Sequence, residues 1–335
     1  MANVMKAVEI KGGKGHADAL FISPATPKPQ PGAGQALVRV KAFGLNRMDL
    51  IQREGFYPLP PQAPSTLGVE FSGTIESFGP GEHGGFQAGD EVFGLAYGGA
   101  YAEHIAVSSK MLLHKPSHLT FEQAAGVPET WITATQALHF VLGMTEGKSV
   151  LWHAGASGVS IAGIQLSRQA GAGAVFATAG TDDKCLFIEK ELGATAAFNY
   201  KTQDWAAEIL KATGGKGVDL IVDFVGASYF QKNLEVAARD GRIVLLGLMG
   251  GRVVENLDIG ALLYKRVRVE GSTLRSRDEE YQGRLRDKLK EYLPKFESGE
   301  LKIFIDTVLS WEEIQKAHGL LEKNITMGKI ICTVP

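Results

Sequence analysis

The amino-acid sequence predicts an α/β protein, in which a β-rich N-terminal part is followed by a doubly wound parallel sheet. In the first third of the chain, apolar and charged residues alternate, as in residues 35–42, which is typical of strands buried on one face. After Pro128, unbroken aliphatic runs alternate with amphipathic stretches, which indicates a parallel sheet covered by helices on both faces. Glycine makes up 41 of 335 residues, which indicates many tight turns between short elements.

The β-rich part is expected to form the first domain, residues 1–127. Its predicted strands are short and are separated by glycine-rich stretches: residues 4–10, 35–42, 71–78 and 91–95. Strands of this length and spacing favour a small barrel or sandwich. The proline-rich residues 23–34 are predicted to be a surface connection.

The second domain, residues 128–271, is predicted to be of the Rossmann type. Its strands are expected at residues 148–154, 174–179, 196–199, 218–225, 242–247 and 266–271. The helices between them are expected at residues 159–170, 182–192, 203–213 and 228–239. The remaining residues, 272–335, are predicted to contain helices at 281–296 and 311–323 and a strand at 329–333. This segment is too small to fold alone, so we expect it to return and complete the first domain.

Charge and cysteine content exclude several classes of protein. The 35 basic and 37 acidic residues give a net charge of −2, which argues against a protein held to nucleic acid or to anionic lipid by bulk charge. Two cysteines cannot form a disulfide framework or a four-thiolate zinc site. No apolar run approaches the ~20 residues of a membrane span, and no signal peptide is visible, so a cytoplasmic location without membrane attachment is expected.

A candidate dinucleotide site follows the first strand of the second domain. In residues 153–160, glycines stand only at Gly155 and Gly158, so the strict GxGxxG pattern is absent. The order strand, turn, helix, strand still favours a pyrophosphate site, because backbone N–H groups at a helix start bind phosphate. The alternative is a glycine-rich turn that binds no nucleotide.

The end of the second strand bears on the choice of cofactor. An NAD site usually has an acidic residue there, whereas this chain has Gly180 and Thr181. Lys184 and the Thr181 hydroxyl suit a 2′-phosphate, so NADPH is favoured over NADH. Asp182 and Asp183 argue the other way, unless they serve only as acidic residues at a helix start.

Several segments together resemble the zinc-independent quinone oxidoreductases of the medium-chain dehydrogenase/reductase superfamily. These proteins are related to zeta-crystallin, and the likeness is greatest to the branch induced by the p53 tumour suppressor. The segments are residues 44–58, 67–79, 128–138, 153–160, 192–201, 217–226, 241–251 and 272–278. The resemblance implies a GroES-like catalytic domain, a Rossmann domain, NADPH as cofactor and a homodimer.

The resemblance also implies that the protein has no metal site. Zinc-dependent relatives carry a cysteine at the position of Asn46 and a histidine at that of Val69, and neither residue of this chain can replace them. Four structural cysteines of those relatives are missing as well. A metal that polarises a carbonyl is therefore not expected.

The residues that the resemblance and the turn assign to the cofactor come from both domains: Asn46, Thr133, Gly155, Ser157, Gly158, Val159, Gly180, Thr181, Lys184, Tyr200, Val225, Leu248, Met249 and Asn324. Asn46 and Tyr57 are the catalytic candidates, because an amide or a hydroxyl can donate to an oxyanion. Ser160 replaces a glycine that is usual in the family, from which we expect only a modest loss of close packing.

These candidates have structural alternatives. Tyr57 could be a surface turn residue, and Asn46 could cap a helix. His153 is predicted to be structural, Glu70 and Asp49 to be structural partners, and Arg275 and Arg277 to be solvated charges.

The predicted function is NADPH-dependent reduction of a quinone by hydride transfer. Reduction of an α,β-unsaturated ketone or aldehyde is an alternative, because it uses the same hydride geometry. A structural or regulatory protein that binds NADPH is an alternative of another class. Some relatives of this kind bind RNA, but the near-neutral charge argues against RNA binding here. The strand at residues 266–271 is predicted to form the edge of the sheet and to pair across a homodimer.

Overall fold

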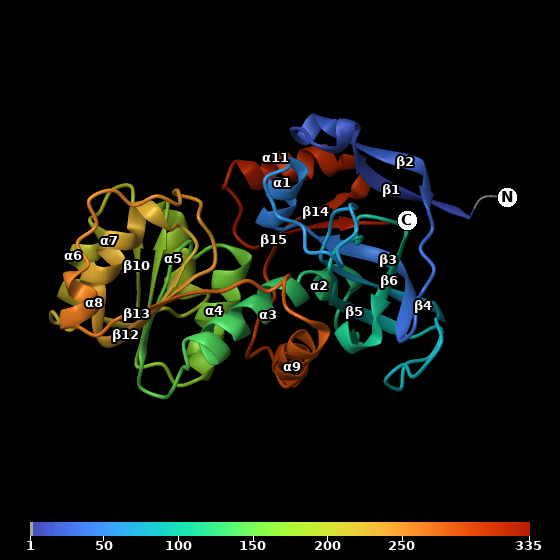
Figure 1. Ribbon diagram of the computed structural model, residues 1–335. Helices are drawn as coiled ribbons and strands as arrows, with labels where there is room; N and C mark the ends of the chain where they lie inside the picture. Colours follow the sequence, from blue (N-terminus) through green and yellow to red (C-terminus); the bar gives the residue numbers. More distant parts are fainter. Residues whose placement is uncertain (1–2) are drawn as a thin grey trace. The chain divides into compact units, whose positions relative to one another are not determined.

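The computed structural model describes residues 3–335 and confirms the predicted α/β fold (Figure 1). Residues 1 and 2, with which the predicted first domain begins, lie outside the described residues. The chain forms two compact units: one consists of the residues up to Ile132 together with Arg275–Pro335, and the other is Thr133–Leu274. Within residues 3–335, no helix has both the length and the apolar character needed to cross a membrane.

The first unit is a GroES-like domain built on a seven-stranded sheet. The order β14-β15-β3-β4-β5-β7 runs through strands far apart in sequence, and β6 also pairs with β3. The strands are β3 (Gln35–Gly44), β4 (Glu70–Phe78), β5 (Glu91–Leu95), β6 (His104–Ser108), β7 (Leu112–His114), β14 (Ile305–Ser310) and β15 (Lys329–Thr333). Strand β3 is central, since it pairs with β15, β4 and β6, and its Val38 and Val40 side chains are fully buried.

A separate two-stranded sheet pairs β1 (Val4–Ile10) with β2 (Leu20–Pro27). The expectation that residues 23–34 form only a connection is therefore wrong for the first five of them. Strand β2 tolerates Pro24 and Pro27 because it pairs on one side only, so a missing N–H need not interrupt a ladder.

The first unit also contains helices and 3-10 turns. The helices are α1 (Arg47–Arg53), α2 (Phe121–Ala125), α9 (Glu279–Lys290), α10 (Leu293–Glu297) and α11 (Ile314–Glu322), with 3-10 turns at Lys11–Gly13, Ala17–Ala19, Ser109–Met111 and Trp311–Glu313. The single helix predicted at 281–296 is two helices, and Pro294 stands in the first turn of the second. The chain passes to the second unit within α3 (Pro128–Thr135), which continues as a π-helix at Gln136–Val141.

The second unit contains a six-stranded parallel sheet in the order β10-β9-β8-β11-β12-β13. The strands are β8 (Ser149–Trp152), β9 (Ala174–Ala179), β10 (Ala196–Asn199), β11 (Val218–Asp223), β12 (Ala237–Leu245) and β13 (Arg268–Gly271). This is the Rossmann order, and it reverses between β8 and β11, where such sheets bind ligands.

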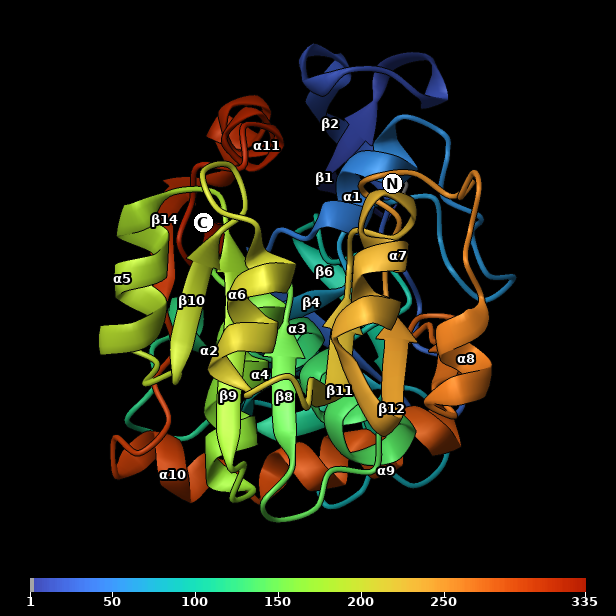
Figure 2. The same ribbon diagram turned by 90° about the vertical axis from the view of Figure 1, so that its left-hand side faces the viewer.

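Helices cover this sheet on both faces, and Figure 2 shows α6 and α7 in front of the strands. The helices are α4 (Gly158–Gln169), α5 (Asp182–Lys190), α6 (Trp205–Ala212), α7 (Ala227–Val236) and α8 (Gly260–Tyr264). The helix predicted at 228–239 ends at Val236, because the next three residues begin β12. The sheet is apolar throughout, and Val150, Leu151 and Trp152 of β8 are fully buried.

Candidate functional site

The turn between β8 and α4 is tightly packed against the neighbouring strand and helix. A Cβ at Gly155 would lie 2.7 Å from Ile188 Cδ1 and 2.8 Å from Ala177 Cβ, so only glycine fits there. Ala154, just before it, has φ of +50°, a left-handed conformation that is strained for a residue with a side chain. Such strain is common at ligand-binding turns.

Helix α4 begins directly after this turn. Ser157 is its N-cap, and the Ser157 hydroxyl accepts a hydrogen bond from the Ser160 N–H at 3.4 Å. Ser160 is fully buried and donates to the His153 carbonyl at 2.8 Å. The serine that replaces the family glycine is therefore well accommodated. The N–H groups of Gly158 and Val159, in the first turn of α4, have no partner within the helix and can hold a phosphate.

Gly163 was not predicted, although it brings α4 against the sheet. A Cβ there would lie 2.2 Å from the indole ring of Trp152. The signal in the sequence was a second helical glycine, five residues after Gly158.

A second group of predicted residues gathers at the carboxyl ends of β9 and β10. A Cβ at Gly180 would lie 2.8 Å from the Tyr200 hydroxyl, so these two residues are neighbours. Thr181 caps α5, and its hydroxyl accepts from the Lys184 N–H at 3.3 Å. Asp182 accepts from the Asn199 side chain at 2.7 Å. Both acidic residues of this turn, Asp182 and Asp183, are exposed in the first turn of α5.

A third group lies at the carboxyl ends of β11 and β12. The Gly250 N–H donates to the Val225 carbonyl at 2.7 Å, which places Val225 beside the loop that carries Leu248 and Met249. The side chains of Leu248 and Met249 are 54% and 53% exposed.

The Thr133 hydroxyl, in α3, is buried and has no hydrogen-bond partner among residues 3–335.

His153 is structural, as predicted. Both ring nitrogens have partners, at 2.9 Å from the Thr178 hydroxyl and 2.7 Å from the Asn233 amide oxygen, and the residue is fully buried. Burial lowers the pKa of His153, so its ring is neutral.

In the first unit, Asn46 is held by an ion pair. Its Nδ2 donates to Glu70 Oε1 at 2.9 Å, and its Oδ1 accepts from Lys329 Nζ at 2.8 Å. Lys329 and Glu70 lie 2.5 Å apart and are both buried. The orientation of the amide is therefore fixed, and one of its two N–H bonds is used by Glu70. Lys329 was not predicted, since a lysine in a strand usually points to solvent.

Asp49 is the second buried carboxyl of this region. Its Oδ2 accepts from the Asn46 backbone N–H at 2.8 Å and from the Tyr101 hydroxyl at 3.1 Å. Burial raises the pKa of Asp49 to about 6, and these hydrogen bonds oppose the rise. Asp49 and Glu70 are thus structural partners, as predicted.

Tyr57 faces Arg275, and the prediction that Arg275 is a solvated charge is wrong. Arg275 is 4% exposed and donates to the Tyr97 carbonyl at 2.6 Å and to Gln52 Oε1 at 2.8 Å. Its guanidinium carbon lies 5.3 Å from the centre of the Tyr57 ring. Tyr57 itself is partly buried, and burial, followed by the charge of Glu129, raises its pKa.

Glu129, near the start of α3, is the third carboxyl of this region and was not predicted. Its backbone N–H donates to Glu70 Oε2 at 2.9 Å. Burial and then the neighbouring charge of Glu70 raise the pKa of Glu129 to about 8. We call Asp49, Glu70, Glu129, Lys329 and Arg275 the charged cluster.

Asn324 lies on an exposed left-handed turn after α11, with φ of +55°. Arg47, the first residue of α1, donates to the Asn324 side chain and, at 2.8 Å, to the Leu321 carbonyl. Arg47 therefore links Asn324 to the helix that follows Asn46. Arg277 is exposed, as predicted.

The donor set does not fit a zinc ion. Among residues 3–335, no three His, Cys, Asp or Glu side chains are grouped as metal ligands. The two carboxylate oxygens of Glu70 already accept from Lys329, Asn46 and the Glu129 N–H. Asn46 and Val69 supply neither a thiolate nor an imidazole.

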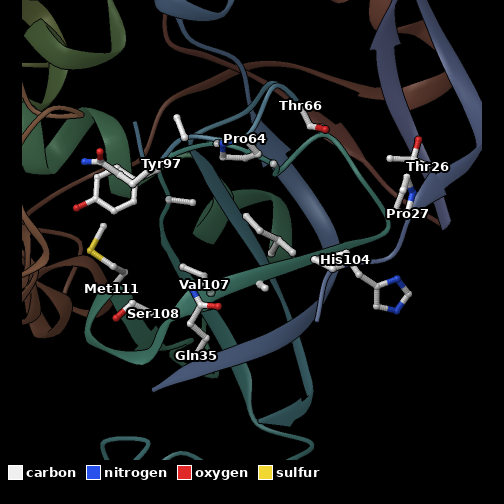
Figure 3. Close-up of a pocket in the computed structure, with 18 of the residues that line it drawn as sticks. Thr26, Pro27, Gln35, Pro64, Thr66, Tyr97, His104, Val107, Ser108 and Met111 are labelled. Carbon is white, nitrogen blue, oxygen red and sulfur yellow. The ribbon is translucent and has the colours of Figure 1, made fainter. Parts of the chain in front are cut away.

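A cavity of about 420 Å³ in the first unit contains none of the predicted site residues (Figure 3). Tyr97, Ser108 and Met111 lie at one end of it, and Thr26, Pro27 and His104 at the other. The Tyr97 hydroxyl donates to the Arg277 carbonyl and the Ser108 hydroxyl to Glu279, both at 2.9 Å. These polar groups are already satisfied, so the charged cluster is the better candidate for chemistry.

Comparison with known proteins agrees with this architecture. Residues 158–291 match the family model described as zinc-binding dehydrogenase, and residues 32–117 match the alcohol dehydrogenase GroES-like domain. The synaptic vesicle membrane protein VAT-1 homolog of Mus musculus is 37% identical over 225 residues, which cover 67% of this chain and 54% of that protein. The match thus spans only about half the length of that relative.

Two solved structures match almost the whole chain. The crystal structure of an NAD-dependent alcohol dehydrogenase is 33% identical with a TM-score of 0.85, over 99% of this chain and 100% of that one. The quinone oxidoreductase of Escherichia coli, solved in complex with NADPH, is 27% identical with a TM-score of 0.85, over 98% and 100% of the two chains. The chain belongs to the medium-chain dehydrogenase/reductase superfamily, in the clade of the quinone oxidoreductases and VAT-1-like proteins.

Proposed function

We propose that this protein is an NADPH-dependent oxidoreductase that transfers hydride to a quinone without a metal. Within the quinone oxidoreductases, we propose that it belongs to the branch induced by the p53 tumour suppressor. The observation that carries the proposal is the glycine turn at the carboxyl end of β8, where the strand order of the parallel sheet reverses. When bound, the reduced nicotinamide would supply the hydride. The chain's own residues would bind, orient and donate hydrogen bonds.

For the cofactor, we assign the phosphates to the turn of Gly155 and to the start of α4, through Ser157, Gly158 and Val159. Gly180, Thr181, Lys184 and Tyr200 form the group at the ends of β9 and β10 that we assign to the adenosine half. The end of β9 is followed by Gly180 and Thr181 in place of an acidic residue, and Lys184 lies in the first turn of α5, which favours a 2′-phosphate at this end and hence NADPH over NADH.

The exposed apolar side chains of Leu248 and Met249, beside Val225, are suited to the flat nicotinamide ring. Thr133 has a buried hydroxyl without a partner among the described residues, which favours a role toward a polar ligand. Asn46 and Asn324 stay predictions from the family resemblance.

For the substrate, Asn46 and Tyr57 are the proposed donors to the oxyanion that forms on reduction. The Lys329–Glu70 pair orients the Asn46 amide, and Arg275 lies against Tyr57. A quinone is electron-poor, so such donors suffice to stabilise its reduced form.

The experiment is a stopped-flow assay of cofactor absorbance, with NADPH or NADH, against an ortho-quinone, a para-quinone and an enone. We expect NADPH oxidation with at least one quinone. Replacing Tyr57 by Phe should lower turnover at normal NADPH binding, and replacing Asn46 by Ala should lower turnover as well. Tight NADPH binding without oxidation by any acceptor would contradict the proposal and favour a regulatory or structural role.

Enone or enal reduction is the second candidate, and Glu129 favours it. Reduction of a carbon–carbon double bond requires a proton for carbon, which a raised carboxyl pKa can supply near neutral pH. The same assay separates the two substrate classes.

We also propose a homodimer that forms through β13. This strand is the exposed edge of the second unit's sheet, and an exposed edge is suited to pairing with its own copy across a twofold axis.

A further inference from the structure

The charged cluster contains three carboxyl groups but only two cations. Lys329 pairs directly with Glu70, and Arg275 lies under Tyr57, where its charge acts on both Asp49 and Glu129. Two cations balance two carboxylates. A third ionised carboxyl would be uncompensated in a largely buried place, which is costly. One of the three is therefore expected to hold its proton near neutral pH.

The hydrogen bonds to the three carboxyl groups indicate which of them holds the proton. Glu70 accepts hydrogen bonds from Lys329, from Asn46 and from the Glu129 N–H. Asp49 accepts from the Asn46 N–H and the Tyr101 hydroxyl. The Glu129 side chain receives no hydrogen bond from residues 3–335, so nothing of this kind stabilises its negative charge.

Glu129 is also the accessible member of the three. Asp49 and Glu70 are fully buried, whereas Glu129 is partly exposed. Its backbone N–H donates to Glu70 Oε2 at 2.9 Å, which places Glu129 beside the Lys329–Glu70 pair, and its charge acts on Tyr57 and on Arg275. The groups that face Glu129 are Glu70 from β4, Asp49 from α1, Lys329 from β15, and Arg275.

We propose that Glu129 is the proton donor of the reductase reaction. The inference rests on the proposed function. The hydride pair of NADPH reduces the acceptor and NADPH becomes NADP⁺. The O–H bond of Glu129 breaks as a new bond to hydrogen forms on the reduced acceptor, at oxygen for a quinone and at carbon for an enone. The Glu129 carboxylate then takes a proton from water.

Tyr57 is less suited to be the final proton source, because burial and the charge of Glu129 both raise its pKa above the usual value. A hydroxyl that holds its proton so firmly can donate a hydrogen bond to the oxyanion. It therefore complements an acid that titrates near pH 8, which is close to the ideal for proton transfer at neutral pH.

The test compares Glu129→Gln with the wild type and with Glu122→Gln, a control in the neighbouring helix α2 and outside the charged cluster. NADPH affinity is measured by fluorescence titration, and kcat is measured against pH with the best acceptor. We expect unchanged NADPH affinity and a kcat about 100-fold lower in Glu129→Gln, since a general acid typically contributes at least this factor. The wild-type kcat should fall as pH rises through about 8, and this fall should disappear in the variant.

A second measurement is independent of turnover. The infrared C=O stretch of a protonated carboxyl should be present at pH 7, disappear as pH rises through about 8, and be absent from Glu129→Gln. A Glu129 carboxyl that is ionised at pH 7, or a variant with the wild-type kcat and pH profile, would overturn the inference. A wild type that reduces no acceptor would overturn the proposed function and the catalytic role with it, and the infrared titration would still report the carboxyl by itself.

Discussion

At the residue scale, Lys329 organises the donors of the first unit. Its ammonium lies within hydrogen-bond distance of Glu70, of the Asn46 amide oxygen and of the Leu45 carbonyl. A buried lysine with three oxygen partners uses all three of its N–H donors. Lys329 thus fixes the orientation of the Asn46 amide. Its removal should therefore lower the stability of the protein and disturb the orientation of that amide.

We predict that Lys329→Met lowers the free energy of unfolding by about 3–5 kcal/mol, because it leaves the Glu70 carboxylate buried and unpaired. Urea unfolding followed by circular dichroism measures this, with the exposed Lys323→Met as control. Adding Glu70→Gln to Lys329→Met should recover part of the loss. A double variant whose loss equals the sum of the two single losses would show that the pair is not coupled.

At the scale of elements, several strands were predicted with their exact bounds, whereas β6, β7 and β14 were not predicted at all. The strands Val4–Ile10, Glu91–Leu95 and Ala174–Ala179 have the predicted bounds, because turn residues delimit each apolar run. The helix predicted at 228–239 was too long, because residues 237–239 have no strong breaker, and Ala237 instead begins β12 and pairs with Val218 of β11. Local patterns do not contain such tertiary constraints.

The packing of α4 on β8 depends on Gly163. We predict that Gly163→Ala lowers the free energy of unfolding by about 1–3 kcal/mol or more, because its Cβ would lie 2.2 Å from the Trp152 ring and force a rearrangement. Gly319→Ala, in α11, meets no atom within 4 Å and should instead stabilise the protein, by up to about 1 kcal/mol. Thermal or urea unfolding compares the two variants. Similar effects of both would show that contact with Trp152 is unimportant.

The contact between α11 and α1 should make the protein sensitive to acid. His318 is fully buried beside Arg53, and burial together with that charge lowers its pKa from 6.5 to about 3. Between these values the unfolded chain binds a proton that the folded protein does not, so stability should fall as pH decreases from 6.5 to 3.

The corresponding variant is His318→Asn, which removes the titrating ring. We expect its free energy of unfolding to depend less steeply on pH below 6.5 than that of the wild type. The exposed His118→Asn serves as control and should keep the wild-type slope. Equal slopes for all three proteins would contradict the assignment.

At the scale of the whole molecule, the two parts of the candidate site differed in how far they could be predicted. The turn at Gly155 and the start of α4 lie within a few residues of each other, so strand, turn and helix signals located them. The charged cluster combines residues from widely separated segments, such as Glu129, Arg275 and Lys329. Nothing local to Arg275 distinguishes it from a solvated arginine, and only the fold makes it a buried partner of Tyr57.

The exposed edge strand β13 bears on how the protein assembles. Strand β13 is an edge of its sheet, and the preceding helix α8 carries Leu263 and Tyr264, which are 73% and 75% exposed. Large apolar side chains beside an open strand edge are typical of a surface that another chain covers.

We predict that the wild type is a dimer at micromolar concentration and that Leu263→Lys with Tyr264→Lys makes it a monomer. Light scattering after size-exclusion chromatography measures the mass, with Val308→Lys, 48% exposed on β14 of the first unit, as control. Since both α8 side chains are exposed in the single chain, the double variant should keep its fold. A wild-type monomer, or a double variant that stays dimeric, would contradict pairing through β13.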